Sequence, residues 1–176
     1  YDNSNDKIFL EIENLDKEFL YVNALSEGIG SNDIGLDRGQ LGNTRIVKFI
    51  KAGNKLLLIQ PNQYYRAITN NIEEKKSVEQ AFAKSILKGF VIKETKDGKY
   101  LVDATSFFIR DAHGVMGRLS VKKQGKYTLD RSRSAINLER TRAFPENVEF
   151  DVMITFKGVP KGYDIRSVVP TSTSVT

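Results

Sequence analysis

Cysteine is absent from this chain of 176 residues, and histidine occurs only once, as His113. The lack of cysteine excludes disulfide bonds and thiolate metal sites. A single imidazole also excludes the familiar zinc motifs that need two or three histidines. A Ser-His-Asp triad is possible only if His113 serves as its base.

Long apolar runs and proline-rich linkers are also absent. No segment approaches the roughly 18 uninterrupted apolar residues of a membrane-spanning helix, so we expect no membrane span. The chain opens with the polar residues YDNSND and shows no signal peptide. The four prolines are scattered and no internal repeat is visible. A chain of this length can bury one core, so we expect residues 1–176 to form a single domain.

The net charge of +5 is unevenly distributed. Residues 1–43 carry nine acids against three bases, whereas residues 44–109 carry twelve bases against six acids. Residues 110–142 carry nine bases against three acids. A basic half can attract nucleic acid or anionic lipid, but no aromatic-rich RNA-binding motif accompanies these bases. We therefore expect the acidic N-terminal strands to lie beside the basic ones and cancel part of their charge, with no nucleic-acid partner.

Most segments alternate apolar and polar residues with a period of two, which is typical of β-strands. KIFLEI and FLYVNAL are predicted to be two strands joined by the turn ENLDKE. TRIVKFIKAGNKLLLIQ is predicted to be a hairpin that turns at residues 52–54. GFVIKETKDGKYLVDAT is predicted to be another, turning at Asp97-Gly98, a pair that accepts positive φ angles. VEFDVMITF is predicted to be a single half-buried strand.

Residues 72–88 are predicted to form the main helix, because apolar residues recur there at helical spacing. Asn71 is expected to be the N-cap, with Glu74 completing a capping box, and Gly89 is expected to end the helix. A lone amphipathic helix has to lay its apolar stripe on the sheet. The predicted fold class is therefore α+β, a mostly antiparallel β-sheet built from hairpins with one main amphipathic helix (about 72–88) packed on it.

The stretch GIGSNDIGLDRGQLG, residues 28–42, is the first candidate functional segment. It lacks the Gly-Lys-Ser/Thr ending and the following helix of a phosphate-binding loop, and Asn32, Asp33 and Asp37 are too sparse for a calcium loop. We expect an ordered connection of roughly 18 residues, a length that is usually functional or mobile. Asp33 and Asp37 can cap backbone amides, and Arg38 can clamp a carboxylate. A self-stabilised loop and a binding loop both remain open.

Two further stretches carry candidate site residues. In FFIRDAHGV, Arg110, Asp111 and His113 suggest a general base. We favour a structural histidine that bonds a backbone carbonyl near a turn. In LDRSRSAINLERTRAFPEN, we expect Arg133 or Arg142 to pair with an acid of the loop.

These stretches also carry a family resemblance. GSNDIGLDRGQLG, QPNQYYRA, VEQAFAKSILKGF, LVDATSFFIRDAHGV and SRSAINLERTRAFPENVEF resemble the domain of unknown function that lies N-terminal to the catalytic region of large, secreted bacterial zinc-dependent metalloproteases. The resemblance runs through most of the chain. The His-Glu-x-x-His zinc motif of that catalytic region does not occur in these 176 residues, so no catalytic residue and no metal ligand carries over.

The resemblance implies an exported protein, either periplasmic, outer-membrane-associated or extracellular. It implies that the chain is one non-catalytic domain of a longer multidomain protein, with no cofactor of its own and with zinc in the catalytic domain. The expected partner is that catalytic domain, in cis, and a peptide substrate is a further expected partner. The candidate interface residues are Asn32, Asp33, Asp37, Arg38, Arg110, Asp111, His113 and Arg133.

Two other functions remain as alternatives. An independent glycan- or peptide-binding module would be indicated by a pocket lined by Tyr64, Tyr65 and Tyr100, whereas a flat apolar patch near the loop would favour docking on the neighbouring domain. The third possibility is a stand-alone hydrolase that uses His113 and a serine.

Overall fold

The computed structural model describes every residue from Tyr1 to Thr176, and the chain folds into two compact units. Unit 1 is formed by residues 1–7, 22–43 and 105–176, and unit 2 is formed by residues 8–21 and 44–104. Each unit buries apolar side chains of its own. The expectation of a single domain over residues 1–176 stays a prediction.

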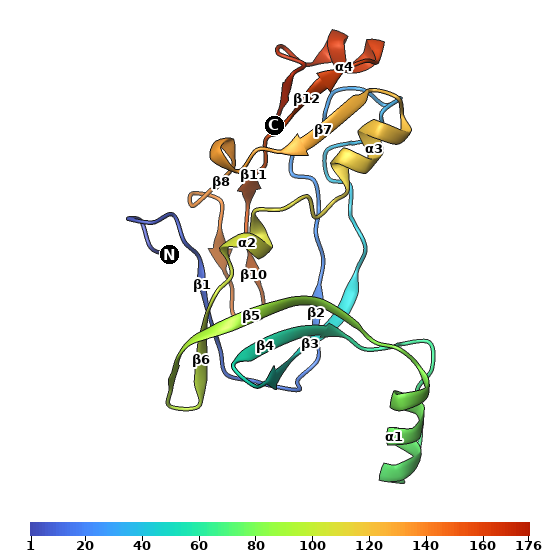
Figure 1. Cartoon of the computed structure of the whole chain (residues 1–176), viewed down its shortest axis with the longest axis vertical. Coiled ribbons are helices and arrows are strands. Elements are labelled where there is room, and N and C mark those ends of the chain that lie inside the picture. The colour runs from blue at the N-terminus through green and yellow to red at the C-terminus, as the bar shows by residue number, and fades with distance from the viewer. The chain divides into compact units, whose positions relative to one another are not determined.

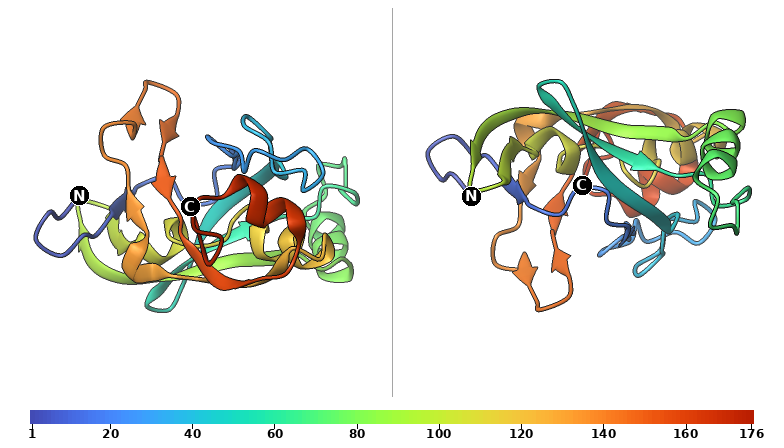
Figure 2. Two further views of the ribbon diagram at one scale, coloured as in Figure 1. Left: turned by 90° about the horizontal axis from the view of Figure 1, so that it is seen from above. Right: turned by 90° about the horizontal axis from the view of Figure 1, so that it is seen from below.

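Unit 2 is built on a six-stranded antiparallel sheet with the strand order β1-β6-β5-β4-β3-β2. The sheet curls strongly, as the long arc of β5 shows in Figure 1 and again in the two views of Figure 2. The elements of this unit are β1 (Phe9–Ile12), β2 (Phe19–Tyr21), β3 (Arg45–Ala52), β4 (Lys55–Gln60), α1 (Ile72–Ala81), β5 (Ser85–Lys96) and β6 (Lys99–Asp103).

The core of unit 2 follows the period-two alternation of its sequence. Val47 and Phe49 are buried on one face of β3, while the residues beside them are less buried. The Phe49 ring centroid lies 5.6 Å from that of Phe19 and 6.0 Å from that of Phe90. Burial of such apolar faces stabilises the unit by about 25 cal/mol for each Å² removed from water.

Both predicted hairpins of this unit are confirmed. The residues Gly53-Asn54 join β3 to β4, and Asp97-Gly98 joins β5 to β6. Asp97 and Gly98 have φ angles of 50° and 77°, the left-handed values that a type I′ turn requires. Aspartate and glycine are among the few residues that accept such angles, so the turn could be predicted from the sequence.

The predicted hairpin between residues 7–12 and 19–25 is wrong. β1 pairs with β6 and β2 pairs with β3, so the two segments form opposite edges of the sheet. The connection between them is held on β3, where the Asp16 N–H donates to the Phe49 carbonyl at 2.8 Å. The turn signal ENLDKE correctly indicated a break between strands, but it carries no information about which strand each segment pairs with.

The predicted helix over residues 72–88 is confirmed only in its first part, because α1 ends at Ala81 and Gly89 lies inside β5. The Asn71 side chain caps the helix by accepting from the Glu73 N–H at 2.9 Å, and no return bond from Glu74 completes the capping box. α1 has no buried residue and stands away from the sheet in Figure 1. The expectation that its stripe packs on the sheet is therefore wrong.

Two contacts within unit 2 account for the short helix. Ser85 pairs with Gln60 at the start of β5, so the sheet takes up residues that would have formed the last helical turn. The Phe82 ring stacks on Tyr65 with the ring centroids 3.9 Å apart, instead of continuing the helical stripe. Long-range pairing of this kind overrides local helix propensity.

The expected cancellation of charge is confirmed within unit 2. Acids of residues 8–21 form ion pairs with the basic segments, namely Glu11 with Lys99 at 3.0 Å, Glu13 with Lys99 at 3.7 Å, Asp16 with Lys48 at 3.3 Å and Glu18 with Arg66 at 2.9 Å. The Glu11 carboxylate, which accepts a hydrogen bond from Lys99, raises the pKa of that amine. Exposed pairs of this kind contribute at most about 1 kcal/mol each, so their main effect is on the surface charge.

Unit 1 combines short helices with small antiparallel sheets whose strand orders are β10-β9, β11-β8 and β13-β12-β7. Its core joins the loop 22–43 to α3, α4 and the three-stranded sheet, and Ile34, Leu119 and Ile165 have no exposed surface. The elements of this unit are α2 (Thr105–Phe108), α3 (Val115–Val121), β7 (Gly125–Leu129), the 3₁₀ turn η1 (Arg131–Arg133), β8 (Ala135–Ile136), β9 (Arg142–Ala143), β10 (Val148–Glu149), β11 (Val152–Met153), β12 (Phe156–Pro160), α4 (Tyr163–Val168) and β13 (Ser174–Val175).

The single strand predicted over residues 148–156 is divided into three short strands. β10 pairs with β9, β11 pairs with β8, and β12 pairs with β7. Phe156 is buried in the core, whereas Val148 at the other end of the pattern is exposed. The alternation of side chains does not reveal this division, because every partner strand offers the same backbone donors and acceptors.

Candidate interaction surface

Residues 22–43 of unit 1 form an ordered loop closed by a short antiparallel ladder. The Gly42 N–H donates to the Asn23 carbonyl at 2.7 Å, and the Leu25 N–H donates to the Gln40 carbonyl at 3.0 Å. Antiparallel bonding at this point brings the two ends of the loop together. The sequence-based expectation of an ordered connection is therefore confirmed.

Ile34 and Leu36 anchor the loop in the core of unit 1. The turn that presents them is closed by the Ile34 and Gly35 N–H groups, which donate to the Ser31 carbonyl at 3.2 and 3.3 Å. Gly35 has a φ of 70°, which a residue with a Cβ rarely adopts. Full burial of an aliphatic side chain is worth about 1.5–3 kcal/mol, so these two residues hold the loop in place. The loop is self-stabilised, and its outward side chains stand on a fixed support.

The four candidate residues Asn32, Asp33, Asp37 and Arg38 lie on the outside of this loop. All four are exposed, and their side chains form no hydrogen bond or ion pair with the rest of the chain. Asp33 and Asp37 do not cap backbone amides, which corrects the role suggested for them. Their charges, and the guanidinium of Arg38, therefore face solvent.

A strip of apolar residues, Val22, Ala24 and Leu41, runs along the outer face of the ladder. Ala24 and Leu41 are bridged opposite each other, so their side chains share a face, and Val22 lies two residues along the same strand. All three residues are exposed, and 69% of Leu41 is open to solvent. This apolar strip is the kind of patch near the loop that favours docking on another protein surface.

His113 ties this loop to the segment 107–115. Its Nδ1 lies 3.2 Å from Asn23 Nδ2, and its Nε2 lies 3.3 Å from Gln40 Oε1. Because a carboxamide nitrogen can only donate, Nδ1 accepts and the Nε2–H group donates to Gln40. Both ring nitrogens therefore bond to side-chain amides, and neither bonds to a hydroxyl as a Ser-His-Asp triad requires. The structural interpretation of His113 fits, although its partners are side chains rather than the expected backbone carbonyl.

Asp111 caps the start of α3 and does not orient His113. Its Oδ1 accepts from the Gly114 and Val115 N–H groups at 2.9 and 2.7 Å, and its Oδ2 accepts from the Met116 N–H at 2.9 Å. The first amides of a helix have no partner within the helix, so a carboxylate at this position satisfies them. The Asp111 carboxylate therefore has a structural role at the start of α3.

Arg110 folds back on the preceding turn. Its Nε donates to the Phe107 carbonyl at 2.8 Å, and its guanidinium carbon lies 4.5 Å from the centroid of the Phe107 ring. The guanidinium therefore lies against the aromatic face, as in a cation–π contact.

Arg133 pairs with Asp130 rather than with an acid of the loop, so the expected pairing is wrong. The Arg133 Nε donates to Asp130 Oδ2 at 3.0 Å, and its Nη1 donates to Ser174 Oγ at 2.8 Å. Ser132 donates to Asp130 through both its N–H and its hydroxyl. The Ser132 hydroxyl is the main cause that lowers the pKa of Asp130, Arg133 and Lys157 lower it further, and burial opposes them.

The arginine-rich stretch nevertheless meets the start of the loop through a different residue. Arg140 lies 2.8 Å from Asp151 and 3.8 Å from Glu27, which immediately precedes the 28–42 stretch. Arg142, the other predicted partner, donates instead to the Thr141 and Leu138 carbonyls.

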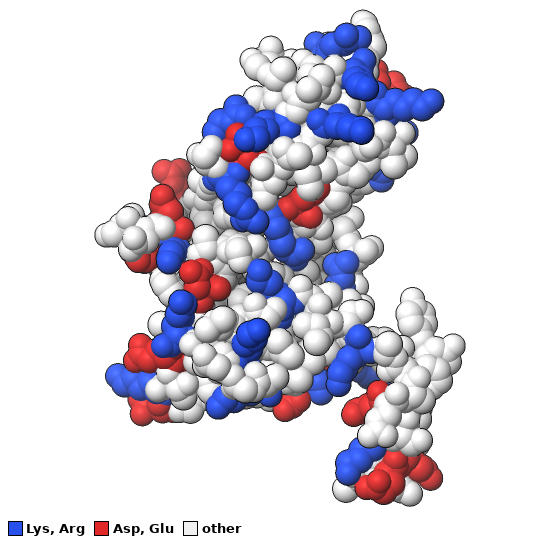
Figure 3. Space-filling view, viewed as in Figure 1, with Lys and Arg blue, Asp and Glu red and all other residues white.

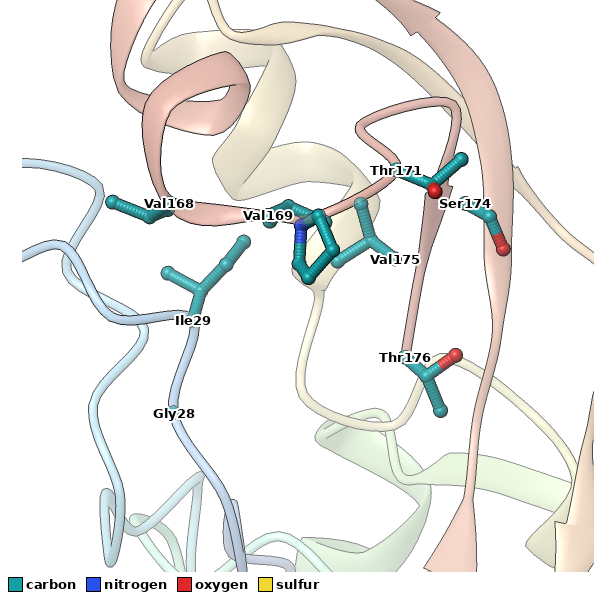
Figure 4. A pocket seen from close by; sticks show the side chains of 9 residues that line it. Gly28, Ile29, Val168, Val169, Thr171, Ser174, Val175 and Thr176 are labelled. Atoms are coloured by element: carbon teal, nitrogen blue, oxygen red, sulfur yellow. The ribbon is translucent and has the colours of Figure 1, made fainter.

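An open pocket of about 380 Å³ lies beside the loop in unit 1 (Figure 4). Gly28 and Ile29 form one wall, and the last residue of α4 and the chain that follows it form the others. The apolar part of the lining comes from Ile29, Val168, Val169, Pro170 and Val175, and hydroxyl groups come from Thr171, Ser174 and Thr176. Arg133 donates to Ser174, one of the residues that line this pocket.

The three tyrosines that would have indicated a ligand pocket do not line this one. Tyr64 is exposed, Tyr65 stacks on Phe82, and Tyr100 lies against Lys51, whose Nζ is 5.3 Å from the ring centroid.

Two general properties of the chain bear on its chemistry. No three of its His, Asp and Glu side chains come together as a group that could hold a metal ion. None of its helices combines the length and the apolar character that crossing a lipid bilayer demands.

The fold and this surface define a small α+β module that presents an anchored loop and an exposed apolar strip. The chain belongs to the family described as a domain of unknown function, DUF5117, whose model matches residues 39–176. The sequence resemblance to a domain of unknown function is confirmed in this general form. Arg110, Asp111, His113 and Arg133 lie inside the matched range, whereas residues 32–38 precede it. No curated protein and no solved structure matches the chain.

Proposed function

We propose that this chain is a non-catalytic interaction domain of a secreted, zinc-dependent metalloprotease-like protein. In this proposal the loop 22–43 docks on the catalytic domain in cis and shapes its substrate cleft. The link to a metalloprotease rests on the sequence resemblance. The choice of surface rests on one observation, which is that the apolar strip Val22, Ala24 and Leu41 lies exposed on a loop whose anchors are buried.

Physical arguments support docking at this surface. Exposed apolar side chains that lie side by side are stabilised when a partner removes them from water. The buried anchors Ile34 and Leu36 order the loop before binding, so little conformational entropy is lost on docking. Arg38 can form a two-bond pair with a carboxylate of the partner, and Asp33 and Asp37 can accept from its cations.

Hydrogen exchange of the loop tests this proposal in the natural-length polypeptide. We expect the amides of residues 22–25 and 38–43 to exchange at least about tenfold more slowly in the natural-length polypeptide than in the 176-residue chain. Docking raises the free energy needed to open this loop to solvent. Leu41→Ser combined with Arg38→Ala should remove this protection and lower peptidase activity. Zinc content and peptidase activity of the same preparation test the identity of the neighbour.

The matched control is Ile68→Ser, which changes an exposed aliphatic residue on unit 2 and should leave the exchange of the loop unchanged. Equal exchange rates in the long and short chains would contradict docking. A natural-length polypeptide without zinc or peptidase activity would contradict the proposed neighbour but not an interaction role.

The pocket beside Ile29 favours a second candidate function, an independent peptide- or glycan-binding module. Its apolar lining suits an aliphatic side chain, and its hydroxyl groups suit the polar atoms of a peptide or sugar. The two candidates separate in the 176-residue chain. The second candidate alone predicts that a short aliphatic peptide or an oligosaccharide shifts the amide resonances of residues 28–29, 168–169 and 171–176. Leu41→Ser should leave these shifts unchanged.

A further inference from the structure

A group of six exposed lysine and arginine side chains covers one end of unit 1. We call it the basic patch, and it consists of Arg118, Lys122, Lys123, Lys126, Lys161 and Arg166. Figure 3 shows basic side chains gathered over the part of unit 1 that Figure 1 labels α3, β7, β12 and α4. Asp164 is the only acid within residues 114–129 and 156–170, and its Oδ2 is engaged by Gln124 Nε2 at 2.8 Å. None of the six side chains forms an ion pair, whereas acids of unit 2 pair with its lysine and arginine side chains.

Gln124, which is buried, fixes the geometry of the basic patch. Its Oε1 accepts from the Ile165 N–H at 3.0 Å, and its Nε2 also donates to the Lys122 carbonyl at 3.1 Å. Its own carbonyl accepts from the Lys161 and Gly162 N–H groups at 2.8 and 3.1 Å. A Cβ at Gly162 would overlap the Gln124 carboxamide, so a larger residue there would have to displace this bonded group. These bonds hold the turn before β7 against the start of α4.

Three exposed apolar side chains lie among these cations. Val121 ends α3 immediately before Lys122, and Tyr163 begins α4; each is 78% exposed. Val159 pairs with Lys126 across β12 and β7, so both side chains lie on the same exposed face of the sheet. The patch is therefore amphiphilic as well as basic.

We propose that the basic patch docks unit 1 on an anionic lipid surface. Anionic headgroups attract each nearby lysine and arginine, and the attraction adds up over the patch. Lysine stems can rest at the interface while their ammonium groups reach the phosphates. A tyrosine is suited to the same boundary, because its ring is apolar and its hydroxyl is polar.

The alternatives fit the patch less well. Phosphates of nucleic acid would attract the cations, but they offer no apolar region for Val121 and Val159. An acidic protein surface would need apolar groups that match the positions of Val121 and Val159. Binding to nucleic acid and binding to an acidic peptide are therefore both included as outcomes of the test. This proposal is independent of the docking loop, because the two surfaces share no residue.

Vesicle sedimentation of the 176-residue chain tests the proposal. We expect binding to vesicles of equal parts phosphatidylcholine and phosphatidylglycerol, and no binding to phosphatidylcholine alone. Lys122→Glu combined with Lys123→Glu should lower the partition coefficient by at least about tenfold, because each cation near the surface contributes a factor of roughly five. The matched control, Lys93→Glu combined with Lys96→Glu, makes the same change in net charge at exposed positions of unit 2 and should keep most of the binding.

A fluorescent probe tests which part of the chain meets the lipid. The chain contains no tryptophan, so Tyr163→Trp introduces a single indole at the basic patch. Its emission should shift to shorter wavelength with anionic vesicles, whereas that of Tyr64→Trp, on unit 2, should not shift.

Absence of vesicle binding, equal loss of binding in both double variants, or an emission shift only in the control Tyr64→Trp would each overturn the proposal. It would also be overturned if Lys122→Glu with Lys123→Glu abolished binding to a DNA duplex or an acidic peptide while vesicle binding was unchanged.

Discussion

At the scale of single residues, Asp130 makes a specific electrostatic contribution to unit 1. Its carboxylate is nearly buried, accepts from the Ser132 hydroxyl at 2.6 Å and lies 3.0 Å from the Arg133 guanidinium. These contacts favour the ionised form and lower the pKa of Asp130 in the folded chain. Its contribution to stability is therefore present above the ordinary pKa of 3.8 and is lost as the pH falls through the lower folded value.

Asp130→Asn is expected to lower the free energy of unfolding at neutral pH, because the neutral amide loses the charge that Ser132 and Arg133 stabilise. The difference from the unmodified chain should shrink as the pH falls below about 3.8, because Asp130 is protonated first in the unfolded chain and then, at lower pH, in the folded chain. Urea unfolding at a series of pH values measures it. Asp37→Asn, at an exposed position without a side-chain partner, serves as the control. A difference that did not vary with pH would argue against this account.

The candidate residues could be selected from the sequence, but their partners could not. His113 bonds to Gln40 and Asn23, which lie 73 and 90 residues away along the chain. Gln124 was missed altogether, because a lone glutamine between a lysine and a glycine looks like an ordinary turn residue. The only sequence signal for this contact comes from Gly125 and Gly162, since residues without a Cβ allow another group to approach the backbone closely.

At the scale of elements, α1 depends on local interactions. It has no buried residue, so its stability comes from its propensity and from the cap that Asn71 provides to the Glu73 N–H. An isolated helix of this length is marginal in water, because nucleation is unfavourable. The stack of Tyr65 on Phe82 joins the two ends of the segment that contains α1.

Asn71→Ala is expected to unfold α1 locally while the sheet of unit 2 stays intact. Loss of an N-cap costs about 0.5–2 kcal/mol, which exceeds what a short unsupported helix can tolerate. Amide exchange of residues 72–81 should become faster, and the midpoint of thermal unfolding should change little. A matched lowering of the exchange protection of β3 and β4 would show instead that α1 is coupled to the sheet.

Elements were predictable where local chemistry alone decides the conformation. The Asp97-Gly98 turn is such a case, because few other residue pairs accept two left-handed φ angles. The C-terminal half of the predicted helix is the opposite case, since helical spacing in residues 82–88 was overridden by the pairing of β5 with β4.

At the scale of the whole molecule, the chain contains two units with different surface electrostatics. In unit 2 the acids of residues 8–21 pair with basic segments. In unit 1 the basic patch retains its positive charge, and Asp164 is the only acid within residues 114–129 and 156–170. The basic patch is therefore a cluster of cations on unit 1 that no acid of the chain neutralises by an ion pair.

Because the two units have separate cores, we expect a cavity made in one core to destabilise mainly the unit that contains it. Leu119→Ala in unit 1 and Leu56→Ala in unit 2 each remove a fully buried leucine side chain and should cost about 2–5 kcal/mol. Leu119→Ala should speed amide exchange mainly in α3, β7 and β12, and Leu56→Ala mainly in β3, β4 and β5. If each variant speeded exchange equally in both units, the chain would unfold as a single domain.

The sequence alone determined the class of the fold, the two tight hairpins of unit 2, the N-cap of α1 and the ordered character of the loop 28–42. These features depend on residues close together in the chain, where backbone angles, capping and alternation act directly. Only the tertiary structure decided which strands pair, where the main helix ends, and which side chains His113, Arg133 and Gln124 meet. Those outcomes depend on contacts between distant segments, for which many residues offer the same backbone groups and charges.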